Sequence, residues 1–226
     1  MAAAIGSFIF VVIEGLLGRS LVLTGNTAMT LTPERPFWMA GHLVNTFILL
    51  AFITLTAWFA TNGRRLNFRI ETKYLAIAAF GFFVIMVVGV SGSIAALASM
   101  LFPADSLGAG IEQDFSPTSN VLLRLRVLHP ILSVLSGMFL IFISGWLKRE
   151  SADDKGVKRW SGVLSLLIVI QLAFGAATLL TLAPIVMQLG HLFLADAIWI
   201  SYVLTAANFL ASRPSRSIAD SKNTLV

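Results

Sequence analysis

The chain of 226 residues contains no cysteine, only three histidines and few charged residues. The absence of cysteine excludes a disulfide framework, a thiolate metal site and a cysteine nucleophile. Charged residues make up 12% of the chain and hydrophobic residues 57%, whereas soluble domains contain about 25% charged and about 45–50% apolar residues. So few charges cannot cover a surface that faces water. The composition therefore excludes an ordinary soluble enzyme, a disordered tail and a nucleic-acid-binding protein.

Six long apolar segments dominate the sequence. A membrane-spanning helix needs roughly 20 consecutive, mostly apolar residues, and this length is reached at residues 3–23, 37–61, 74–102, 121–147, 160–182 and 187–211. Lipid offers the backbone no hydrogen-bond partner, so these segments are predicted to be helices. The first segment lacks a preceding basic stretch and contains Glu14, which indicates a retained span rather than a signal peptide. We therefore predict an all-α, multi-pass membrane protein with six transmembrane helices.

Lysine and arginine gather in alternate loops. Segments 62–73 and 148–159 and the tail after residue 211 hold four, five and three of the 16 basic residues, whereas segment 103–120 is acidic. Because basic loops remain on the cytoplasmic side, both termini are predicted to be cytoplasmic, in a cell membrane of the bacterial type. The net charge of +5 then reports topology, and no nucleic-acid partner is expected.

An internal repeat relates the first two spans to the last two. Ile-Glu-Gly-Leu-Leu-Gly at residues 13–18 aligns with Ile-Gln-Leu-Ala-Phe-Gly at residues 170–175. Gly-His-Leu occurs at residues 41–43 and at residues 190–192, and Leu-Thr-Ala follows at the same spacing in both copies. The shared orientation indicates parallel repeats related by an axis along the membrane normal.

The repeat predicts a division of the chain. Residues 74–211 are expected to form a complete four-helix transmembrane bundle. Residues 1–61 are expected to be a transmembrane helix pair, the second half of an incomplete N-terminal bundle, and residues 212–226 a cytoplasmic tail. The chain is then two helices short of an eight-helix architecture.

The three histidines lie at one predicted depth. His42, His129 and His191 fall about five, eight and four residues inside their spans, within roughly one turn of each other. Ionisable residues at this depth are candidates for function. Imidazole is the standard axial ligand of heme iron, and facing helices can present two of them, so His129 and His191 can clamp one heme. The alternative is that each histidine only hydrogen-bonds a neighbouring helix.

Other residues beside the histidines are candidates for the same site. Gly41 and Gly190 precede two of the histidines and would let a flat macrocycle approach the helix. Arg124 and Arg126 begin the fourth span on the acidic side, where an anion should compensate them. The candidates are heme propionates, because guanidinium binds carboxylate in a bidentate fork, and the acidic residues of segment 103–120.

Three motifs resemble the heme A synthase family of cytochrome oxidase assembly proteins. They are Gly-His-Leu-Val-Asn-Thr at residues 41–46, Leu-His-Pro at residues 128–130 and Gly-His-Leu at residues 190–192. In that family two four-helix halves each carry a histidine pair, with heme b in the C-terminal half and the catalytic site in the N-terminal half. The family's Glu-x-x-His motif and its external cysteine pair have no match in this sequence.

The resemblance implies roles for the histidines and a reaction. His129 and His191 would be the iron ligands of heme b, and His42 would be one of two histidines of the catalytic half; no catalytic residue is assigned. The implied enzyme oxidises a methyl group of heme O, its substrate, to the formyl group of heme A. Its implied partners are the lipid bilayer, heme O synthase, oxidase assembly factors and a second copy of the chain. The alternatives are a non-catalytic bis-histidine heme protein in electron transfer or oxidase assembly, and a small-solute transporter.

Overall fold

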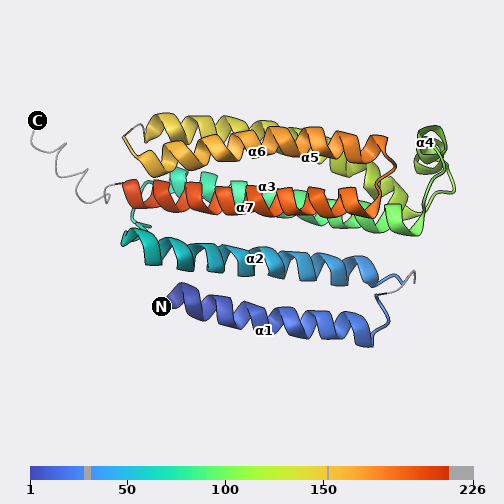
Figure 1. The fold of residues 1–226 in the computed structure, drawn as a ribbon, viewed down its shortest axis with the longest axis horizontal. Coiled ribbons are helices and arrows are strands. Elements are labelled where there is room, and N and C mark those ends of the chain that lie inside the picture. The colour runs from blue at the N-terminus through green and yellow to red at the C-terminus, as the bar shows by residue number, and fades with distance from the viewer. Residues whose placement is uncertain (28–31, 152, 214–226) are drawn as a thin grey trace, which may run out of the picture.

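The computed structural model describes residues 1–27, 32–151 and 153–213, and these residues form seven helices and no strand. Figure 1 shows the long helices lying side by side. The helices are α1 (Ala2–Leu23), α2 (Arg35–Asn62), α3 (Thr72–Leu101), α4 (Leu107–Phe115), α5 (Val121–Glu150), α6 (Lys155–Leu180) and α7 (Ile185–Ser212). All except α4 are long and apolar enough to cross a membrane. The prediction of an all-α protein with six membrane-spanning helices is confirmed.

The helix bounds lie within three residues of the predicted spans except at the start of α6, and one further helix, α4, was not predicted. Helix α6 begins five residues before the predicted span, because the side chain of Asp154 accepts a hydrogen bond from the backbone N–H of Val157 at 2.9 Å and caps the helix. Helix α4 was not predicted, since its nine residues lie in the acidic connection between two spans. Its cap is Ser106, whose Oγ accepts from the backbone N–H of Ala109 at 3.2 Å.

Four helices, α3, α5, α6 and α7, pack on one another, and α2 lies against both α3 and α7. Helix α1 packs on α2 at the edge of the assembly (Figure 1). The connection between α2 and the other helices is centred on Trp199 of α7, which is fully buried. Its ring stacks on Phe47 of α2 with 5.3 Å between centroids, and its Nε1 donates to the carbonyl oxygen of Phe47 at 2.7 Å. The pair of α1 and α2 is therefore joined to the other helices of the same chain through α2.

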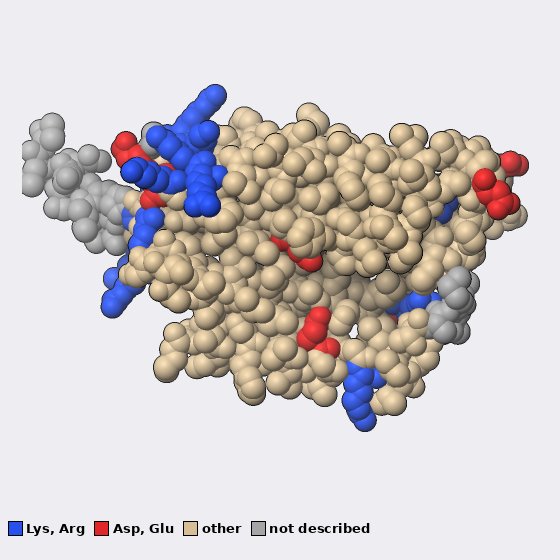
Figure 2. Space-filling view, viewed as in Figure 1, with Lys and Arg blue, Asp and Glu red and all other residues tan. Residues whose placement is uncertain are grey.

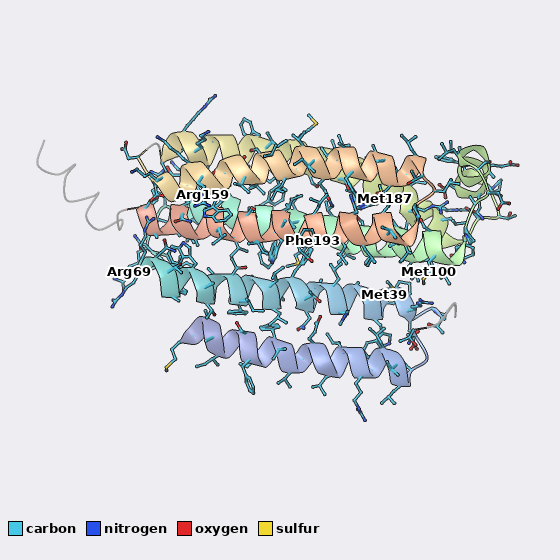
Figure 3. All side chains as sticks on the ribbon, viewed as in Figure 1. Met39, Arg69, Met100, Arg159, Met187 and Phe193 are labelled. Carbon is cyan, nitrogen blue, oxygen red and sulfur yellow. The ribbon has the colours of Figure 1, made fainter. Side chains whose placement is uncertain are left out.

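The two ends of the helical assembly differ in charge. Figure 2 shows Lys and Arg gathered mainly at one end and little charge over the broad middle. Arg69 and Arg159 lie at this basic end, whereas Met39, Met100 and Met187 lie toward the opposite end (Figure 3). Helices α2, α5 and α7 all begin at the end opposite the basic one, so their histidines lie in the same half of the assembly.

Candidate functional site

His129 of α5 and His191 of α7 come together between their helices. Their ring centroids are 6.2 Å apart, and the ring planes are inclined at 88°. An imidazole nitrogen lies about 2.0–2.1 Å from a bound metal ion and about 1 Å from its ring centre, so two rings on opposite sides of one ion have centres roughly 6 Å apart. The separation of His129 and His191 therefore suits two axial ligands of one metal.

The donor set around this pair favours a macrocycle-bound metal over a bare ion. No group of three or more His, Cys, Asp or Glu side chains able to hold a metal occurs among the described residues. Two imidazoles fill two coordination positions, and a heme supplies the four remaining ligands itself. An open apolar hollow of about 400 Å³ lies on one face of α3 and includes Ser91, which contacts His129, but neither histidine lines it. The donor set of the pair is therefore compatible with a heme.

Each histidine of the pair is held by a polar side chain from the preceding span. Ser91 of α3 places its Oγ 3.0 Å from Nδ1 of His129. Gln171 of α6 places its Nε2 3.3 Å from Nε2 of His191 and donates to the carbonyl oxygen of the same residue at 3.0 Å. Ser91 thus contacts Nδ1 of His129 and leaves its Nε2 free, as the outer partner of a metal-binding histidine does. Gln171 instead contacts Nε2 of His191, whose buried Nδ1 has no hydrogen-bond partner.

Two glycines let the rings lie close to the preceding spans. A Cβ added to Gly92 would lie 3.0 Å from Cε1 of His129, and one added to Gly175 would lie 2.9 Å from Cε1 of His191. The glycines expected to admit a macrocycle have different surroundings. Gly41 faces open space, and a Cβ on Gly190 would lie 2.8 Å from the ring of Phe174. The glycines that contact the histidine rings are thus on the neighbouring helices. Gly175 lies in the repeated segment 170–175, whereas no sequence pattern distinguishes Gly92.

His42 belongs to a separate cluster between α1 and α2. Its Nε2 lies 3.6 Å from Oε1 of Glu14, and the two side chains are 39% and 21% exposed. Glu14 also accepts hydrogen bonds from Nδ2 of Asn45, at 2.5 Å, and from the hydroxyl of Thr46. Asn45 is buried and donates in addition to the carbonyl oxygen of Phe10 at 3.0 Å. The carboxylate within the first span is therefore paired, as its depth requires.

The arginines at the start of α5 contact the segment that carries α4. Arg126 donates to Oδ1 of Asp114 through Nε at 3.0 Å and through its terminal nitrogen at 2.5 Å. Arg124 donates to Oγ of Ser119 at 3.2 Å and to the carbonyl oxygen of Pro117 at 2.7 Å. Arg126 is therefore paired with an acidic residue of segment 103–120, one of the two predicted kinds of anion. Binding of a heme propionate by Arg124 or Arg126 remains a prediction.

The sequence is similar to proteins that are already described. A family model described as cytochrome oxidase assembly protein matches residues 1–203. Two curated relatives, from two strains of Thermus thermophilus, are each named protoheme IX farnesyltransferase and are 37% and 36% identical to this chain over 201 residues. The matched region is 89% of this chain and 33% of each relative, so the chain spans about a third of their length. No solved structure matches the chain.

Proposed function

Because this chain belongs to the family of cytochrome oxidase assembly proteins, we propose that it is a heme A synthase-type oxidoreductase, which oxidises a methyl group of heme O to the formyl group of heme A. The observation that carries the proposal is the pairing of His129 and His191, with ring centroids 6.2 Å apart. The relatives' name, which specifies an enzyme acting on protoheme IX, supports a heme as the class of ligand. Heme O synthase and other oxidase assembly factors are the partners that this function requires.

In this proposal the two histidines hold heme b, and the rest of the site keeps them in place. When bound, this heme supplies reversible one-electron transfer. With both imidazoles engaged, His129 and His191 would hold a heme that serves as an electron carrier rather than as the substrate. Ser91 and Gln171 fix the ring orientations, and the surrounding apolar helices exclude water and thereby affect the redox potential.

The proposal includes an orientation in a bacterial cell membrane. Since basic loops remain in the cytoplasm, the basic end of the assembly is placed on the cytoplasmic side together with both termini. The histidine pair and α4 then lie toward the outer side. Heme would enter the site from the lipid phase or from the outer membrane surface.

A second candidate function is electron transfer or oxidase assembly by a heme protein without the oxidation reaction. One observation favours it: the histidines that lie together are His129 and His191, and this pair would hold the heme. His42, expected in the catalytic half, faces Glu14 and not another histidine. This candidate retains the heme site and omits heme O as a substrate.

Production of the chain in a bacterial host that makes heme O separates the two candidates. The purified protein is extracted with acidic acetone, and its hemes are resolved by chromatography and mass spectrometry. Formation of heme A that depends on the chain supports the oxidoreductase. Recovery of heme b with heme O unchanged supports the non-catalytic heme protein, and purified, folded protein without any heme contradicts both.

A further inference from the structure

The turn between α5 and α6 carries basic side chains that have no anionic partner. We call residues 148–151 and 153–159 the basic turn. It contains five exposed cations, which are Lys148, Arg149, Lys155, Lys158 and Arg159. Within the part of the chain that the structure describes, no side chain of the five forms an ion pair or a hydrogen bond. Figure 2 shows Lys and Arg side chains projecting at this end of the assembly.

The acidic residues of the basic turn are engaged by arginines from other segments. Glu150 accepts a hydrogen bond through Oε2 from Arg213 at 2.9 Å. Asp154 accepts through Oδ2 from Arg64 at 2.8 Å. Asp153 is the one carboxylate of the basic turn that has no ion pair among the described residues, and it is exposed. Five cations are therefore accompanied by a single free negative charge.

Helix α6 itself does not explain two of these cations. Lys155 and Lys158 lie in its first turn, where the aligned peptide dipoles place a partial positive charge. Basic side chains are unfavourable at this end of a helix, whereas they are favourable at the other end. The repulsion between the two lysines and the helix terminus is removed by an anion that comes from outside the chain.

Two tryptophans place the basic turn at the level of lipid headgroups. Trp146 precedes Lys148 by two residues on α5, and Trp160 directly follows Arg159 on α6. Tryptophan is enriched at the boundary between membrane and water. At a rise of about 1.5 Å per residue, the five cations lie within roughly 8 Å of the indoles along the helix axes, on the side away from the spans. The guanidinium of Arg159, labelled in Figure 3, lies 5.4 Å from the centroid of the Trp160 ring.

We propose that the basic turn binds the phosphate groups of anionic phospholipids, with Lys155 and Lys158 as its principal contacts. A phospholipid headgroup carries the negative charge that the basic turn lacks, and it lies at the depth that the tryptophans mark. The alternative is that the cations only set the orientation of the chain during insertion. That role predicts no lipid preference of the folded protein. The inference is independent of the heme reaction and of the side of the membrane on which the basic end lies.

The lipid preference of the folded chain tests the inference. The protein is reconstituted in nanodiscs that contain equal amounts of phosphatidylglycerol, which is anionic, and phosphatidylcholine, which has no net charge. Native mass spectrometry then counts the lipids of each kind that remain bound. A basic side chain at an anionic membrane surface contributes about 1 kcal/mol, roughly a fivefold factor. The parent chain should therefore prefer phosphatidylglycerol by at least roughly 25-fold, and Lys155→Gln with Lys158→Gln should lower this preference by roughly 25-fold.

The matched control removes two cations from the other basic loop at the same end. Arg65 and Arg69 are exposed and form no ion pair among the described residues, and Arg65→Gln with Arg69→Gln should keep the preference of the parent. A second double variant of the basic turn, Lys148→Gln with Arg149→Gln, should lower the preference from the α5 side. Equal unfolding temperatures of all variants in pure phosphatidylcholine show that the fold is kept.

A free anion is distinguished from a lipid by thermal unfolding of the parent protein. Phosphatidylglycerol in the nanodisc should raise the unfolding temperature, whereas inorganic phosphate added to phosphatidylcholine nanodiscs should not. An equal rise with inorganic phosphate would assign the basic turn to a soluble anion and contradict the lipid site.

The lipid counts can also overturn the inference. A parent chain that retains both lipids equally has cations that serve topology alone or an acidic protein, and not a lipid. An equal loss of preference in the Arg65 and Arg69 control shows a diffuse attraction to the whole basic end. Loss of preference in both double variants of the basic turn, with the control unchanged, supports the lipid site whether or not the chain makes heme A.

Discussion

The ring of His191 lies against the backbone of Gly175, so closely that a Cβ at residue 175 would be 2.9 Å from Cε1 of the imidazole. Real Cβ atoms are essentially never found at this distance from a neighbour. The glycine therefore sets how near α6 and the histidine of α7 can lie. Because Gln171 and Gly175 are one helical turn apart on α6, the same face of this helix both orients the ring and leaves room for it.

Gly175→Val is expected to displace His191 and to lower heme retention by at least about tenfold, on the scale of losing an outer partner. The helix itself should still form. The matched control is Gly162→Ala on the same helix, where an added Cβ meets no atom within 4 Å. This change should stabilise the protein slightly, by about 0.5–1 kcal/mol, since glycine is unfavourable in a helix interior. Heme content per protein and thermal unfolding measure both effects. Full heme retention by Gly175→Val would contradict the close packing.

The predictable part of this site followed from the length of the apolar segments and the position of each histidine within them. Long apolar runs identified the six spans, and histidine at one depth in three of them identified the candidate ligands. The repeat aligned Glu14 with Gln171, but alignment alone did not show that both face a histidine. That contact depends on how the helices of each pair are rotated about their axes, which apolar residues on all sides of a helix do not specify.

The residues that contact the histidine rings and were not predicted belong to residue types that are common in membrane helices. A serine such as Ser91 and glycines such as Gly92 and Gly175 are common in membrane helices, so composition does not distinguish the ones that touch a ring. Helix α4 was missed because nine residues are too few for a span and its connection is polar. Since both Gln171 and Gly175 lie in the repeated segment, comparison of side-chain chemistry between the copies was the signal that pointed toward them.

The packing of α2 on the bundle should depend on Trp199. Trp199→Ala removes a fully buried indole, its stacking on Phe47 and a hydrogen bond to the backbone of α2. We expect the free energy of unfolding to fall by about 3–5 kcal/mol. Phe193→Ala is the control, because Phe193 lies on the same helix and is 72% exposed. Unfolding is followed by circular dichroism in detergent micelles, and equal losses for the two variants would contradict the central role of Trp199.

The ion pair of Arg126 and Asp114 should attach α4 to α5. Both side chains are mostly buried, at 14% and 17% exposed, and Asp114→Asn removes the charge from their hydrogen bonds. The free energy of local opening of α4 should fall by about 1.5–3 kcal/mol, the contribution of hydrogen bonds to charged groups. Amide hydrogen exchange of residues 107–115 measures this opening. Asp105→Asn, at an exposed position, is the control, and unchanged exchange in Asp114→Asn would show that other contacts hold the helix.

The orientation can be tested directly, because the chain has no native cysteine. Single variants Asp153→Cys and Thr118→Cys introduce one thiol at exposed positions on opposite ends of the assembly. With the basic end in the cytoplasm, a membrane-impermeant maleimide added to intact cells should label residue 118 and not residue 153. Residue 153 should become reactive after lysis. The reversed pattern would invert the proposed topology.

The central claim is that His129 and His191 together hold one heme, and electron paramagnetic resonance of the purified ferric protein tests it most directly. The parent chain should show a six-coordinate, low-spin heme with two imidazole ligands. His129→Ala and His191→Ala should each remove the low-spin signal, with a larger loss of heme than the roughly 10–100-fold effect of an outer partner, while His42→Ala should keep it. A low-spin signal that persists without His129 or His191, or one that disappears only without His42, would contradict the account.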